Sequence, residues 1–257
     1  MSVASVEVRT EADRVEPDPE QVPDRDLPMA LEDHLEELRG RLVVCVTTWV
    51  LASGVAYYYS SYLLESIRGL AGANFKFIYT KPTEAFFAIM KLAMVAGLFV
   101  ALPVLIYQVV MFVSPGLTRR ERKWMLRLVP FSVLLFCTGG LFAWFVALPV
   151  MWRFFLSFQS PGIEALWTIG DVVGFVVGLL VLCGIVFELP LVMLFAALAG
   201  LIHSSTLRQH RKVVIFAAFV ISAIATPTPD AFTASVVAVP ILVLFELSLV
   251  LMRLLGR

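Results

Sequence analysis

Three kinds of acidic residue in this sequence could do chemistry: acids near the ends of long apolar segments, acids inside such segments, and an acid in a proline-rich turn. Glu37 and Glu121 are of the first kind, Glu188 and Glu246 of the second, and Asp230 of the third. A carboxylate at the end of a segment can bind a cation such as a guanidinium through charge-assisted hydrogen bonds. An ionised carboxylate inside a membrane costs a few kcal/mol, so Glu188 is expected to be protonated or to face a wet cavity.

The composition indicates where these acids lie. The chain has 257 residues, of which 60% are hydrophobic and 16% are charged, and its mean hydropathy is +0.88. Soluble domains contain about half apolar and about a quarter charged residues, so an ordinary soluble domain is excluded. The net charge of zero is unevenly distributed, because residues 1–37 contain twelve acids and three bases. Residues 1–30 are expected to form a disordered acidic tail, since they have few large apolar side chains and four prolines.

Long uncharged runs predict an all-α integral membrane protein with one six-helix domain, residues 31–255. A bilayer core about 30 Å thick needs roughly 20 apolar residues per helix. Gly200 and the turn at residues 226–230 are expected to end two of the runs. We expect spans at about residues 43–63, 86–113, 125–150, 169–198, 213–227 and 231–252, of which the last two are short. Four prolines are expected to kink the bundle: Pro103, Pro149, Pro190 and Pro240.

The distribution of lysine and arginine predicts the orientation of these spans. Basic residues are enriched in the cytoplasmic loops of membrane proteins. One set of termini and loops carries twelve of them, at residues 39, 41, 119, 120, 122, 123, 127, 208, 211, 212, 253 and 257. The loops expected on the other side carry four, at residues 68, 76, 81 and 153. Both termini are therefore expected to be cytoplasmic.

Residues 29–42 have the pattern of an amphipathic helix at the membrane surface before the first span. Apolar residues recur at 31, 35, 38 and 42, which places them on one helical face. Glu37 and Arg41 are four residues apart and can form an ion pair. Two interpretations remain: a surface helix with solvated charges, or a carboxylate presented to a cationic ligand.

The basic loop after the second expected span contains Glu121, the other acid near the end of an apolar segment. Residues 114–116 read Ser-Pro-Gly, a turn signal that closes the second span. Glu121 follows as the only acid among four bases at residues 119–123. It could form a surface salt bridge of little energetic value, or it could converge with Glu37 at the inner ends of the first three spans.

The remaining candidates also have structural interpretations. Glu188 could accept a hydrogen bond from a neighbouring helix, and Asp230 could cap the last span. Gly174 and Gly178 have the GxxxG spacing that permits close helix approach. An alternative function, a proton-coupled small-solute transporter, would use Glu188 and Glu246 as titrating groups. It predicts internal repeats, and the sequence shows no such repeat.

Several chemistries are excluded by what the sequence lacks. It contains no GxxxxGK[ST] phosphate loop, no HExxH motif and no CxxC pair, and its three histidines, at residues 34, 203 and 210, are expected at or beyond helix ends. An ATPase, an intramembrane protease and a CxxC metal site are therefore not expected. The basic residues follow the expected topology rather than forming a nucleic-acid surface. We therefore expect no enzyme activity, no cofactor, no metal and no nucleic-acid partner.

Short motifs in a fixed order resemble the TatC family, the multi-spanning subunit of the twin-arginine protein translocase. The resemblance covers about residues 29–255, nearly everything except the acidic tail. The motifs that carry it lie at residues 34–42, 81–87, 107–108, 112–117, 121, 187–190, 226–230 and 244–246. It implies a concave bundle in the inner (plasma) membrane of a prokaryote.

The resemblance also implies a function and partners. The protein would recognise twin-arginine signal peptides of folded proteins at the cytoplasmic face, and would scaffold a translocation complex driven by the proton gradient. The implied partners are the single-span subunits TatA and TatB, the signal peptides, the lipid bilayer and further copies in an oligomeric complex. No ATP hydrolysis by the protein itself is implied.

Specific residues follow from the same resemblance. Glu37 and Glu121 match the carboxylates that receive the two arginines, and Glu188 matches a partner site in the concave hollow. The other implied signal-peptide residues are Phe112, Pro115, Leu117 and Arg39, and the implied outer turn contains Pro227, Pro229 and Asp230. Two features depart from the family pattern: the acidic tail, and Glu36, which adds a second possible acceptor beside Glu37.

Overall fold

The described part of the chain is almost entirely helical. The computed structural model describes residues 31–71, 76–113, 119–160, 166–198, 202, 204–226 and 230–254. Its α-helices are α1 (Leu31–Tyr58), α2 (Ser60–Ala71), α3 (Glu84–Val113), α4 (Arg119–Phe142), α5 (Leu148–Leu156), α6 (Ile169–Phe187), α7 (Leu189–Leu198), α8 (Ser204–Gln209), α9 (Arg211–Ala225) and α10 (Ala231–Leu254). A π-helical turn, Ala143–Ala147, joins α4 to α5. The all-α fold expected from the apolar runs is thus confirmed.

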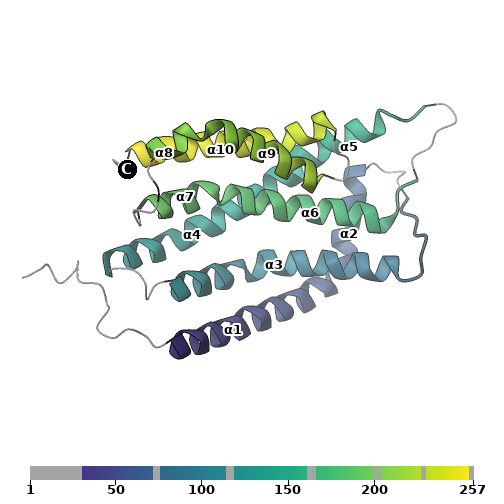
Figure 1. Ribbon diagram of the computed structural model, residues 1–257. Helices are drawn as coiled ribbons and strands as arrows, with labels where there is room; N and C mark the ends of the chain where they lie inside the picture. The colour runs from purple at the N-terminus through teal and green to yellow at the C-terminus, as the bar shows by residue number, and fades with distance from the viewer. Residues whose placement is uncertain are drawn as a thin grey trace, which may run out of the picture.

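The long helices form a bundle with two distinct ends (Figure 1). α1 begins and α10 ends at one end, which we call the terminal end; α3 and α7 also end there, and α4 begins there. α3 and α6 begin at the opposite end, which we call the far end, and α2 lies near it. A backbone bridge joins Ile78 to Thr168 at the far end. The shared end of α1 and α10 agrees with termini on one side, while the side itself stays a prediction.

Five helical segments are long and apolar enough to cross a membrane. They are Glu32–Tyr58, Glu84–Val113, Arg122–Leu156, Ile169–Ala197 and Ala231–Arg253. α9 has 15 residues, about 22 Å at 1.5 Å per residue, so it is shorter than the hydrocarbon core. α10 has 24 residues, about 36 Å long. The expectation that the last two helices are both short is therefore wrong for α10, whose length exceeds the hydrocarbon core although its bounds lie close to the expected span 231–252.

The beginning of the bundle also differs from the expectation. Residues 31–42 do not form a separate surface helix; they are the first turns of α1, which continues without a break to Tyr58. The single glycines within α1 do not interrupt it, as is usual for isolated glycine in a strong helical pattern. The first span was expected to reach residue 63, but α1 ends at Tyr58 and α2 begins at Ser60. α2 was not anticipated.

Kinks and close contacts shape the middle of the bundle. Pro103 lies inside α3, and Glu188 with Pro190 marks the break between α6 and α7. α4 approaches α6 closely at Gly139, where an added Cβ would lie 2.4 Å from the carbonyl oxygen of Cys183. An added Cβ at Gly174 or Gly178 would meet nothing within 4 Å. The GxxxG spacing therefore does not mark a helix contact in the described part of the chain.

Candidate functional site at the terminal ends of α1 and α3

Glu37 lies on the side of α1 that packs against α3, and its carboxylate is held by a residue one turn later. The Nε of Arg41 donates to Glu37 Oε1 at 2.9 Å, and the Arg41 Nη2 donates to the same oxygen. The Arg41 Nη1 donates to Gln108 Oε1 on α3 at 3.0 Å. This confirms the expected Glu37–Arg41 pair and adds an anchor on α3. The side chains of Glu37 and Arg41 are about one-fifth exposed.

The second carboxylate oxygen of Glu37 is buried but accepts no hydrogen bond from any described residue. The Nδ1 of His34 lies 3.8 Å from Glu37 Oε2, beyond hydrogen-bond distance. The His34 ring stacks on Phe112 of α3, with ring centroids 4.5 Å apart and planes 14° apart. A buried carboxylate oxygen without a donor is costly, so Oε2 is the atom at which a cationic donor would gain most.

Two charged residues close to Glu37 on α1, Glu36 and Arg39, differ from it in exposure. Glu36 and Arg39 are exposed on α1, whereas Glu37 is half-buried against α3. The helical period causes this difference, since successive side chains point about 100° apart around a helix. Of the two neighbouring acids, only Glu37 forms the contact with α3 through Arg41.

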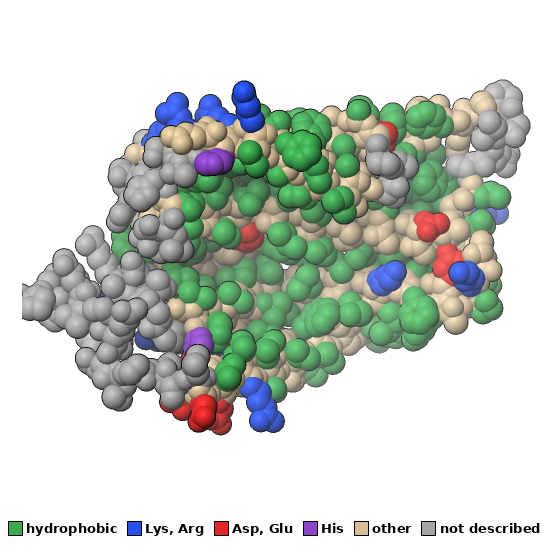
Figure 2. Space-filling model, in the orientation of Figure 1, with side chains coloured by type: hydrophobic (Ala, Val, Ile, Leu, Met, Phe, Trp, Pro, Cys, Tyr) green, Lys and Arg blue, Asp and Glu red, His purple; other side chains and the backbone are tan. Residues whose placement is uncertain are grey.

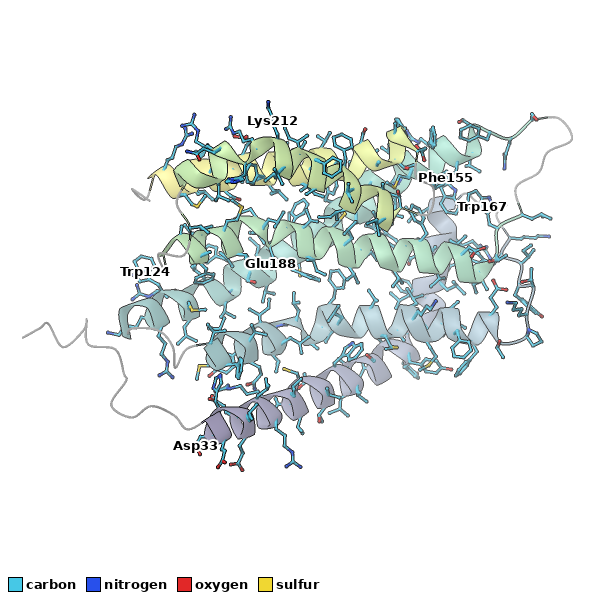
Figure 3. All side chains as sticks on the ribbon, in the orientation of Figure 1. Asp33, Trp124, Phe155, Trp167, Glu188 and Lys212 are labelled. Carbon is cyan, nitrogen blue, oxygen red and sulfur yellow. The ribbon has the colours of Figure 1, made fainter. Side chains whose placement is uncertain are left out.

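The other expected residues of the site are described only in part. Glu121 lies in the first turn of α4, and its side chain is outside the described part of the structure. Pro115 and Leu117 lie outside the described residues. Figure 3 places Asp33 of α1 and Trp124 of α4 at the same end of the bundle. The backbones of Glu37 and Glu121 therefore lie at one end, and the meeting of their carboxylates stays a prediction.

Glu188 lies at the break between α6 and α7 (Figure 3). The hydroxyl of Ser132 on α4 donates to Glu188 Oε2 at 2.8 Å, so the neighbouring-helix hydrogen bond expected as one interpretation is present. Glu188 Oε1 is buried and accepts no hydrogen bond from the described residues. Glu188 thus has one carboxylate oxygen bonded to a neighbouring helix and one buried oxygen without a described donor.

Glu246 and Asp230 both have structural roles. The Nη2 of Arg211 on α9 donates to Glu246 Oε2 at 2.6 Å, and both side chains are about half exposed. Glu246 is therefore one half of an ion pair between α9 and α10. Asp230 caps α10 as expected, because its Oδ1 accepts from Thr233 N at 2.8 Å. Pro227 and Pro229 lie outside the described residues.

Two charged residues of the far end were missed as candidates. Glu84 opens α3 and accepts hydrogen bonds from the backbone nitrogens of Thr80 and Gly170. Lys91 lies one to two turns further along α3 and lines a polar pocket beside Glu84. A single lysine close to the start of a long apolar run is the signal that could have identified this region.

Comparison with known proteins decides the family. Residues 33–240 match the family model described as TatC, Sec-independent protein translocase protein (TatC). The chain belongs to the TatC family. This relationship supports a protein translocase component over a small-solute transporter.

Relatives and solved structures agree with this assignment. The chain is 35% identical to the Sec-independent protein translocase protein TatC of Carboxydothermus hydrogenoformans over 225 residues, which are 87% of this chain and 93% of that protein. It is 39% identical to the TatC protein of Magnetococcus marinus, covering 85% of this chain and 82% of that one. A crystal structure of the twin-arginine translocase receptor TatC aligns with a TM-score of 0.77 at 34% identity, covering 87% of this chain and all of that chain. This TatC-family chain is a multi-pass membrane protein.

Proposed function

We propose that this chain is the signal-peptide receptor of a twin-arginine translocase, and that Glu37 binds one arginine of the signal peptide. The observation that carries the proposal is the buried Oε2 of Glu37, which accepts no hydrogen bond from the described residues. The similarity to solved twin-arginine translocase receptors supports the proposal.

A guanidinium suits this position better than an ammonium. It presents several N–H donors in a planar fork, whereas a lysine is a compact point charge. Arg41 already occupies Oε1 of Glu37, so the arginine of the peptide would approach Oε2. Phe112 and His34 form a stacked aromatic wall beside that oxygen, against which the arginine stem can pack.

The second arginine of the peptide is assigned to Glu121. Two carboxylates explain a requirement for two arginines, since each charge-assisted hydrogen bond contributes about 1.5–3 kcal/mol. Pro115 and Leu117 would shape the loop between α3 and α4, and Arg39 would line the approach from the exposed side of α1. The bound peptide would lie at the cytoplasmic face, in the inner membrane of a prokaryote.

The same proposal assigns the remaining partners. TatA and TatB, the single-span subunits, would complete an oligomeric complex with this chain as scaffold. Glu188 would receive a partner helix; its buried Oε1, which accepts no hydrogen bond from the described residues, is the atom left for such a contact. Pro227, Pro229 and Asp230 would form the outer turn. The chain would act as a receptor rather than an enzyme, with the proton gradient driving transport.

The test is photo-crosslinking of a twin-arginine signal peptide to membranes that contain the full chain. Glu37→Gln and Glu121→Gln should each reduce crosslinking at least about tenfold, the equivalent of one lost charge-assisted hydrogen bond. Glu36→Gln is the matched control, because Glu36 is exposed beside Glu37; it should crosslink as the unmodified chain does. A Lys-Lys peptide should crosslink weakly to all four proteins. Equal crosslinking of the Glu37, Glu121 and Glu36 variants would overturn the proposal.

A further inference from the structure

A polar pocket lies at the far end of the bundle, well away from Glu37. It has a volume of about 380 Å³ and is lined by residues of α3, of α6 and of the segment before α3. Its charged lining residues are Lys81, Lys91, Glu84 and Asp171. Figure 2 shows Lys or Arg atoms beside Asp or Glu atoms at this end of the visible face.

The two carboxylates of the pocket are occupied by local hydrogen bonds. Glu84 Oε2 accepts from the backbone N and the hydroxyl of Thr80, at 2.8 and 3.1 Å, and Glu84 Oε1 accepts from Gly170 N at 3.1 Å. Asp171 Oδ2 accepts from the hydroxyl of Thr168 at 2.9 Å. These bonds hold both carboxylates against the residues at the starts of α3 and α6.

The two lysines have no such partners. Neither Lys81 nor Lys91 forms an ion pair with any residue that the structure describes. Lys91 is exposed although it lies on a membrane-spanning helix, where an unpaired ammonium is costly. An anion from outside the described chain would therefore be stabilised in this pocket.

The depth of Lys91 indicates which anion is available. α3 has 30 residues and is about 44 Å long, roughly 14 Å more than the hydrocarbon core. If this excess is shared by both ends, the first 7 Å or so of α3 lie among the headgroups. Lys91 is about 10 Å from the start of α3, so its flexible side chain can extend to the phosphate layer.

An apolar groove lies next to the pocket along α3. It runs between α1 and α3, has a volume of about 370 Å³ and is lined mainly by Trp49, Val50, Tyr57, Met90 and Met94. Phe87, which lines the pocket itself, is 57% exposed. Cationic and apolar surfaces are thus adjacent, and the groove begins within one helical turn of Lys91.

We propose that Lys81 and Lys91 bind the phosphate of a membrane phospholipid whose acyl chain lies in the groove between α1 and α3. Free phosphate shares the charge but not the apolar part, and the groove favours the lipid. This site is independent of Glu37 and does not require that the chain bind signal peptides. A bound lipid would link α1, α3 and α6 at the far end.

The experiment measures phospholipid binding to the purified full chain by native mass spectrometry. Dioleoyl phosphatidylglycerol is titrated against the unmodified protein and a Lys81→Gln/Lys91→Gln variant. The matched control is Lys76→Gln, because Lys76 is exposed at the same end and does not line the pocket. A Lys81→Arg/Lys91→Arg variant keeps both charges. Dioleoylglycerol, which lacks the phosphate, tests binding through the acyl chains alone. Excess inorganic phosphate, added as a competitor, tests binding through the phosphate alone.

We expect the Gln/Gln variant to bind phosphatidylglycerol at least about tenfold more weakly than the Lys76→Gln control. The Arg/Arg variant should retain binding, since guanidinium groups also bind phosphate; this retention shows that a loss in the Gln/Gln variant comes from charge rather than unfolding. Equal binding by the Gln/Gln and Lys76→Gln variants would overturn the proposal. So would equal binding of dioleoylglycerol, or full displacement by inorganic phosphate.

Discussion

A glutamate lies at each end of α3, Glu84 on α3 itself and Glu37 on the adjacent α1, and the two differ in how many of their oxygens accept hydrogen bonds. At the far end, both oxygens of Glu84 accept hydrogen bonds, from Thr80 and from Gly170. At the terminal end, Glu37 Oε1 is held by Arg41, while Oε2 accepts none from the described residues. The first carboxylate joins two segments of the chain, and the second has one oxygen without a donor among the described residues.

Under the proposed function, this difference distinguishes Glu84 as a structural acid from Glu37 as a ligand-binding acid. Glu84 joins α3 to the first turn of α6, beside the backbone bridge between Ile78 and Thr168. Glu37 is fixed in position without being saturated, because Arg41 is itself anchored to Gln108. Such preorganisation lowers the entropic cost of binding a ligand.

The largest expected effect is an opposite response of the two acids to the same substitution. Glu37→Gln should weaken twin-arginine peptide binding by about 1.5–3 kcal/mol, tenfold or more, because it removes a charged acceptor. Glu84→Gln should leave peptide affinity unchanged and lower the thermal unfolding midpoint, because it weakens the joint between α3 and α6. Isothermal titration with the peptide and a thermal scan of each purified protein would measure both. Loss of peptide affinity in the Glu84 variant would contradict the assignment of peptide binding to Glu37 and of a structural role to Glu84.

The second effect concerns the contact that holds α1 against α3. An added Cβ at Gly97 would lie 2.6 Å from the backbone N and Cα of Ser53. Gly97→Ala should therefore push α1 away and reduce the free energy of unfolding by about 1–3 kcal/mol, as overpacking does. Gly54→Ala is the control, since an added Cβ there meets nothing within 4 Å. Equal thermal stability of the two variants would show that the close approach of α1 and α3 at Gly97 does not contribute to stability.

Much of the fold could be predicted from the sequence, because its helices follow the apolar runs and their breakers. The expected spans 86–113, 169–198 and 231–252 correspond to α3, to α6 with α7, and to α10. α2 was missed because Glu65 and Arg68 interrupt the apolar run. Its apolar residues at 63, 64, 67 and 70 have helical spacing, and that periodicity was the available signal.

The candidate site could be predicted only in part. The spacing of Glu37 and Arg41 predicted their ion pair, since this depends on one helix alone. The contact of Arg41 with Gln108 and the stacking of His34 on Phe112 join residues more than 60 positions apart. These contacts depend on how α1 packs against α3, which no local pattern specifies. The same holds for the hydrogen bond between Ser132 and Glu188.

A smaller effect is expected from the anchor of Arg41. Gln108→Leu removes the acceptor for Arg41 Nη1 and should weaken peptide binding by about 0.5–1.5 kcal/mol, the usual net value of one hydrogen bond. The physical reason is indirect: Arg41 becomes mobile, and Glu37 loses part of its fixed orientation. Gln159→Leu, at an exposed position just after α5, should bind the peptide normally. Unchanged affinity in the Gln108 variant would show that the contact between Arg41 and Gln108 does not preorganise Glu37 for peptide binding.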